Sequence, residues 1–147
     1  MSTLKRTFRI VAIKGHGAFE NFATEVPDFA RQLLHRTREI ENHTNIEIAL
    51  FEPKMNDDHL EGHYYVGILV KDRPSQVPKG MEYLEVSGTY VSAEGSIDCI
   101  DLLYNQVGQW RMEQNLTRDW LTYIVETYHP TENGEDVEVF LPVLDPE

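Results

Sequence analysis

The chain has 147 residues, 41% hydrophobic and 26% charged, which fits one folded domain with its own core and excludes a disordered tail. A formal net charge of −12 disfavours direct contact with nucleic acid or with an anionic membrane. No apolar stretch reaches the roughly 18 residues of a membrane span, and the first residues, MSTLKRTFRI, lack the apolar core of a signal peptide. The single cysteine, Cys99, cannot form an internal disulfide, so we expect a cytoplasmic protein.

The first half of the chain predicts three strands and one helix. The predicted strands span residues 6–14, 46–51 and 64–70. Gly15 and Gly17 are expected to close the first strand. An apolar stripe at helical spacing from Val26 to Ile40 predicts a helix after it. The polar residues 54–62 predict a loop between the second and third strands.

The second half repeats this pattern. The predicted strands span residues 82–91, 120–128 and 137–143. Gly95 is expected to end the first of them, and Ser96 can cap a helix whose apolar side runs from Ile97 to Trp110. Residues 71–80, which include Pro74 and Pro78, form the natural joint between the halves.

Two β-α-β-β units, in halves of residues 1–73 and 81–147, therefore predict a single α+β domain. One unit of about 70 residues cannot bury both its helix and its sheet. Two units can pair their sheets about a pseudo-two-fold axis, giving a mostly antiparallel sheet with two helices and a ligand cleft near the axis.

Glu126 is the main candidate for a functional residue. In the strand predicted at residues 120–128, alternate residues share a face, so Glu126 lies with Ile124 and Tyr128. Both faces are largely apolar, and a carboxylate there needs a partner. A cationic ligand could supply the charge, but so could an Arg or a tyrosine hydroxyl of the chain itself. Aligning the halves at Pro53 and Pro130 places Ala49 at the position that Glu126 has in the second half, and this asymmetry favours a binding site.

Aromatic residues expected near Glu126 are candidates for the cleft wall. They are Tyr65, Tyr104, Trp110, Tyr128 and Phe140. The tyrosines suit such a place because each has an apolar body and a polar tip. A tryptophan at helical spacing is more often a core residue than a ligand platform, so Trp110 is the weaker candidate.

The remaining motifs predict neither a metal nor a cofactor. His59 and His63 have the i, i+4 spacing of a metal-binding pair, but that spacing faces one way only on a helix, and Gly62 and Pro53 indicate a loop. The sequence shows no catalytic Ser-His-Asp or Cys-His signature, and no phosphate-binding glycine loop follows a strand.

Dispersed residues across most of the chain, and most strongly in residues 82–143, resemble the GyrI-like family, which includes the effector-binding domains of AraC-type transcription activators. These residues are Tyr90, Gly95, Tyr104, Trp110, Glu126-Thr127-Tyr128 and Phe140-Leu141-Pro142-Val143. The resemblance implies a duplicated β-α-β-β fold that binds amphipathic, often cationic molecules, with Glu126 as the principal polar contact. The helix-turn-helix module often fused to such domains is not expected before Phe8.

Three functions follow from these expectations. The first is a module that binds or sequesters small cationic amphipathic molecules. The second is a hydrolase of reactive small molecules, with Glu126 as general base and a tyrosine, Tyr65, as proton donor. The third is the ligand-sensing partner of a separate DNA-binding chain. The expected partners are a small organic cation and, beyond it, a second copy of the chain or a regulator, without direct contact to nucleic acid or membrane.

Overall fold

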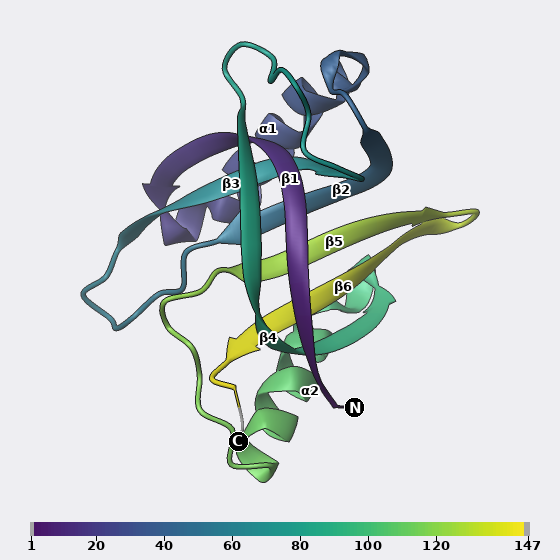
Figure 1. Ribbon diagram of the computed structural model, residues 1–147. Coiled ribbons are helices and arrows are strands. Elements are labelled where there is room, and N and C mark those ends of the chain that lie inside the picture. Colours follow the sequence, from purple (N-terminus) through teal and green to yellow (C-terminus); the bar gives the residue numbers. More distant parts are fainter. Residues whose placement is uncertain (1, 146–147) are drawn as a thin grey trace.

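In the computed structural model, which describes residues 2–145, each half has the order strand, short 3-10 helix, α-helix, strand, strand. The first half comprises β1 (Thr3–Ala18), η1 (Phe19–Asn21), α1 (Phe22–Leu34), η2 (Thr37–Glu39), β2 (His43–Phe51) and β3 (Glu61–Val70). The second half comprises β4 (Glu82–Ser96), η3 (Ile97–Cys99), α2 (Ile100–Glu113), β5 (Ile124–Thr131) and β6 (Gly134–Val143). The predicted α+β architecture with two helices and antiparallel strands is confirmed (Figure 1).

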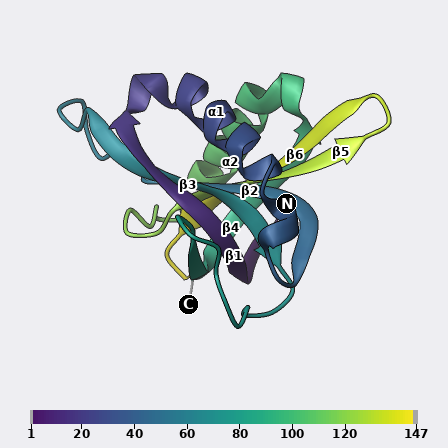
Figure 2. The same cartoon turned by 90° about the horizontal axis from the view of Figure 1, so that it is seen from above.

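The six strands pair in the closed order β1-β3-β2-β5-β6-β4. The long strands β1 and β4 each serve both halves, because their first parts pair with each other and their last parts pair with β3 and β6. The halves meet again where β2 pairs with β5. Both α-helices lie on the same side of the strands, one over each half (Figure 2).

Two of the predicted strand boundaries are wrong for local reasons. β1 continues through Gly15 and Gly17 instead of ending there, since these glycines serve close packing. A side chain on Gly15 would collide with the ring of Tyr64, and one on Gly17 with the carboxylate of Glu25. β5 begins at Ile124, not at residue 120, because the side chain of Asp119 binds the backbone N–H of Leu121 and the hydroxyl of Thr122 in a turn.

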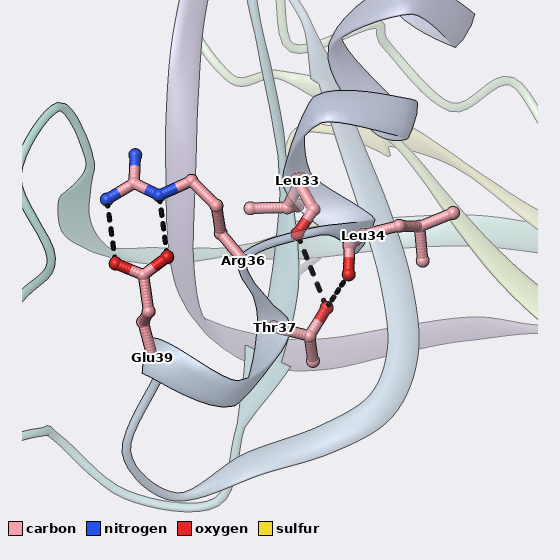
Figure 3. Close-up of polar contacts among 5 residues, drawn as sticks. All are labelled: Leu33, Leu34, Arg36, Thr37 and Glu39. Atoms are coloured by element: carbon pink, nitrogen blue, oxygen red, sulfur yellow. Dashed lines mark hydrogen bonds and ion pairs between the residues drawn. The ribbon is translucent and has the colours of Figure 1, made fainter.

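The first helix ends earlier than its apolar stripe predicts. α1 stops at Leu34, and the hydroxyl of Thr37 donates to the carbonyls of Leu33 and Leu34 (Figure 3). The Arg36 side chain binds both carboxylate oxygens of Glu39, at 2.9 and 3.2 Å, across the 3-10 turn η2. Ile40 still reaches the core, at 2% exposure, from outside the helix. The periodicity therefore identified residues that face the core, of which Leu33 and Ile40 are fully buried, but not where the helix ends.

Three apolar clusters fill the molecule. Residues of α1 pack with the first half of the sheet, around Val11 and Tyr64. Residues of α2 pack with the second half, around Val91 and Val139. The third cluster contains no helix residue and lies on the other face of the strands. Each helix thus covers its own half. Neither described helix is long and apolar enough to cross a membrane.

Candidate functional site

A cavity of about 600 Å³ lies where the two halves meet on the helix side of the sheet. Its walls come from α1, from η3 and the start of α2, and from the paired strands β2 and β5. Most of the lining is apolar, and the main apolar residues are Phe22, Val26, Leu34, Phe51, Ile97 and Ile100. A volume of this size fits a drug-sized organic molecule.

Glu126 lines this cavity and is 8% exposed. One carboxylate oxygen accepts a hydrogen bond from the hydroxyl of Tyr104 on α2. The other accepts one from the hydroxyl of Tyr128, two residues along β5, at 2.5 Å. The tyrosine partners left open by the sequence therefore exist, and both are neutral donors.

These hydrogen bonds do not offset the loss of hydration around the carboxylate. Burial raises the pKa of Glu126 above its ordinary value, and the bonds from Tyr104 and Tyr128 reduce that rise without cancelling it. Burial, followed by the charge of Glu126, raises the pKa of both tyrosines well above the usual range. Both phenols therefore remain protonated donors near neutral pH.

The charge of Glu126 has no cationic partner within residues 2–145. Three more acids line the cavity, namely Glu47, Asp101 and Glu135. Burial raises the pKa of Glu47, and the charge of Glu135 adds a smaller rise. The guanidinium of Arg31 also reaches the wall, but it is paired with Asp28. The cavity is therefore apolar on its walls and negative in potential, which favours an organic cation.

The pairing of β2 with β5 explains the asymmetry seen in the sequence. Ala49 and Glu126 are direct cross-strand partners, so their side chains lie on the same face. The two residues occupy corresponding places in the two repeats. The alignment of the halves at their prolines gave this correspondence but not the cross-strand pairing, and at these two places the acid occurs in the second repeat only.

Three of the predicted wall residues meet in the cavity: Tyr104, Glu126 and Tyr128. The other three lie elsewhere, and their expected placement is corrected. Trp110 is six residues after Tyr104, about 9 Å further along the helix, where it packs on the α2 cluster. Tyr65 and Phe140 point to the opposite face of the sheet. The hydroxyl of Tyr65 donates to Glu82 at 3.2 Å, which removes it as a proton donor for Glu126.

The wall contributed by the first half was not predicted from the sequence. Phe22 and Val26 belong to α1, and Phe51 ends β2. The repeat itself held the signal. Val26 and Tyr104 are each the fifth residue of their helix, and Phe51 follows Ala49 as Tyr128 follows Glu126. Once the two halves were aligned, each candidate in the second half had an identifiable counterpart in the first.

No protein-family model matches the sequence, and no curated protein matches it. The structure does match solved structures. SAV2435, bound to tetraphenylphosphonium, aligns with a TM-score of 0.70 and 14% identity over 97% of this chain and 94% of its own. An integron cassette protein from the mobile metagenome of Vibrio cholerae aligns at 0.65 with 13% identity, over 97% and 94%.

A third match is EcmrR in its complex with DNA. It aligns with a TM-score of 0.62 and 11% identity over 99% of this chain, which spans 57% of the EcmrR chain. The EcmrR C-terminal domain alone aligns at 0.56 with 10% identity, over 99% and 98%. At such low identity these superpositions establish a shared fold, and the fold that the resemblance to the GyrI-like family implied is confirmed.

Proposed function

We propose that this chain, which has the GyrI-like fold, is a binding domain for small amphipathic organic cations. The observation that carries the proposal is Glu126, a buried carboxylate in an apolar cavity whose hydrogen-bond partners among residues 2–145 are neutral hydroxyls. A buried charge of this kind is costly when it is unpaired, and a bound cation would remove that cost.

The chemistry of the walls defines the class of ligand. Glu126 attracts the positive charge, and Tyr104 and Tyr128 hold its two oxygens in a fixed orientation. Phe22 and Phe51 supply aromatic surface across the cavity. Aromatic contact to a desolvated cation contributes about 1–2 kcal/mol. A cation with a bulky apolar body satisfies both features, whereas a small hydrated ion satisfies only the first.

The similarity to SAV2435 supports the same class, because that protein is bound to tetraphenylphosphonium, a cation surrounded by four phenyl groups. The EcmrR match supports a regulatory setting for such a domain. With a net charge of −12, this chain itself is not suited to hold DNA. A regulatory role would therefore need a DNA-binding part outside these 147 residues, and this domain would act as its ligand-sensing partner.

Two ions of the same shape and opposite charge test the proposal. Tetraphenylphosphonium is expected to bind in a calorimetric titration, while tetraphenylborate is expected to show no saturable binding. Glu126→Gln should weaken the phosphonium titration and keep the thermal melt cooperative. Equal binding of the two ions would show that the cavity recognises the shape of the ion and not the sign of its charge. Binding of neither would reject the cavity as a site for organic cations of this size.

A further inference from the structure

Away from the cavity, four polar side chains form a continuous series of contacts. Glu52 follows β2, and His59 lies in the loop between β2 and β3. His63 lies on β3, and Tyr123 directly precedes β5. Figure 1 shows this loop and the segment leading into β5 along the same side of the molecule. Tyr123 packs on the cluster of the sheet face that carries no helix, so the series is separate from the cavity.

The contacts of His59 determine which of its ring nitrogens carries the proton. Its Nδ1 accepts a hydrogen bond from the backbone N–H of Met55 at 3.0 Å. The ring proton is therefore on Nε2, which lies 3.2 Å from Oε2 of Glu52. Both nitrogens are engaged, so His59 has no lone pair left to accept a further proton.

His63 is arranged differently. Its Nδ1 lies 3.0 Å from Oε1 of Glu52, and because a carboxylate can only accept, Nδ1 carries the proton. The lone pair of Nε2 then faces the hydroxyl oxygen of Tyr123 at 2.5 Å, and Tyr123 donates to it. A carboxylate, an imidazole and a hydroxyl in this order form the arrangement by which an oriented histidine activates a nucleophile.

The carboxylate of this series stays ionised. Partial burial alone would raise the pKa of Glu52, but the hydrogen bond from the backbone N–H of His63, and the positive charge that each imidazole carries once it is protonated, bring it below its ordinary value. Glu52 can therefore stabilise a positive charge that forms on His63. This is the role of the acidic member in such a series.

Tyr123 needs a base to lose its proton. Its ring packs edge-to-face on His63 and Tyr65, with centroids 5.3 and 6.0 Å apart. Burial, then the charges of Glu52 and Glu82, raises the pKa of Tyr123, so the free phenolate is scarce near neutral pH. The side chain remains only half-buried, so a small reagent can approach it from solvent. Three more titratable groups face this cluster: Glu82 on β4 accepts the hydrogen bond of Tyr65, Lys14 on β1 lies 5.8 Å from the centre of the Tyr65 ring, and His16 on β1 is the cross-strand partner of His63.

We propose that Tyr123 is a base-activated nucleophile toward small activated acyl or sulfonyl compounds. Its oxygen forms a bond to the electrophilic carbon or sulfur while the phenolic proton moves to Nε2 of His63. The bond to the leaving group breaks, and the leaving group departs with the electron pair. Glu52 stabilises the imidazolium, and the product is an aryl ester or sulfonate on Tyr123.

An arylsulfonyl fluoride provides the test, with peptide mass spectrometry to measure the labelling rate of each tyrosine. Tyr83 is the control within the same chain, because its hydroxyl donates to the carboxylate of Glu85 at 2.7 Å instead of to an imidazole. Near neutral pH, Tyr123 is expected to react about 100-fold faster than Tyr83, the lower end of what a positioned general base contributes. Equal rates at the two tyrosines would overturn the proposal.

The two histidines give a matched pair of variants. His63→Gln removes the base and is expected to reduce labelling of Tyr123 to the rate of Tyr83. His59→Gln removes the other imidazole on Glu52 and should change the rate by no more than about twofold. Equal losses in both variants would mean that the series only holds the loop in place, and the proposal would fail.

The pH profile of the wild-type protein tests the proposal without any variant. Labelling of Tyr123 should fall in acid, because a protonated imidazole can no longer accept the phenolic proton. Labelling of Tyr83 should instead keep rising toward alkaline pH as its phenolate forms. A Tyr123 profile parallel to that of Tyr83 would exclude His63 as the base.

Discussion

Corresponding positions of the two repeats carry different side chains along the cavity wall. The fifth residue of the helix is Val26 in the first half and Tyr104 in the second. At the strand junction Ala49 faces Glu126, and two residues later Phe51 corresponds to Tyr128. The first half thus presents only apolar groups at these three places. The second half presents a carboxylate and the two hydroxyls that bind it.

The shape of the cavity and its polar groups therefore have different origins in the two repeats. The duplicated backbone creates the space between the halves, and each repeat contributes a helix and a central strand to it. The polar groups of one repeat then set which end of a ligand lies where. A cation with an apolar body is expected to place its charge over β5 and its apolar part against α1. Four substitutions or conditions can break or sharpen this comparison.

The largest effect is expected from giving the first half an acid at the position that corresponds to Glu126. Ala49→Glu would place a second buried carboxylate directly across from Glu126, without a partner. An uncompensated buried charge costs about 3–5 kcal/mol, measured as the loss of unfolding free energy in urea at neutral pH. Ala49→Gln is the control of equal size and should cost less. Equal losses in the two variants would show that steric overlap, and not charge, keeps the acid out of this half.

The next largest effect is expected from removing the charge of Glu126. Glu126→Gln keeps the shape and the acceptor for one tyrosine but removes the charge, so phosphonium affinity should fall by about 1–3 kcal/mol. Calorimetric titration measures this loss directly. Glu138→Gln removes the same charge from β6 outside the cavity and should leave affinity nearly unchanged. Equal losses in both variants would assign the attraction to net charge alone.

A smaller effect is expected from the apolar half. Phe51→Leu keeps an apolar side chain but removes an aromatic ring from the wall, which should weaken an aryl cation by about 0.5–1.5 kcal/mol. Competition titrations against a tetraalkylammonium ion provide the comparison, because that ion gains less from a ring. If both cations lose the same affinity, Phe51 acts by filling volume and not as an aromatic surface.

The sequence predicted the parts of the fold that depend on local pattern. Alternation correctly placed Glu126 and Tyr128 on one face and Val125 on the other. It could not place Tyr65 or Phe140, because which face of β3 or β6 meets the helices depends on strand pairing across the whole sheet. Trp110 was misplaced because rotation along α2 carries it away from the cavity.

The series formed by His59, Glu52, His63 and Tyr123 could not be predicted from the sequence for a similar reason. The spacing of His59 and His63 is visible in the chain, but Glu52 and Tyr123 reach them only when β3 pairs with β2 and the segment before β5 folds alongside. No group of three or more possible metal ligands occurs within the described residues. The spacing that suggested a metal pair belongs instead to a hydrogen-bonded series.

The smallest effect concerns pH and follows from the raised pKa of Glu126. A cation binds the ionised form, so affinity should fall as pH drops through the pKa of Glu126 in the empty protein, by about twofold where half of the carboxyl is protonated.

For the empty protein, the effect of pH on folding stability has the opposite sign to that of a salt-bridged acid. Because the folded-state pKa lies above the ordinary 4.5, ionisation of Glu126 destabilises the fold as pH rises through that window, and acid relieves the cost. Glu47 contributes in the same direction, so the part due to Glu126 is the difference between the wild-type and Glu126→Gln stability profiles. Melts with and without tetraphenylphosphonium should therefore show a ligand-induced shift that is larger at neutral pH than in mild acid. A shift that grows in acid would mean that the cation is held by something other than an ionised Glu126.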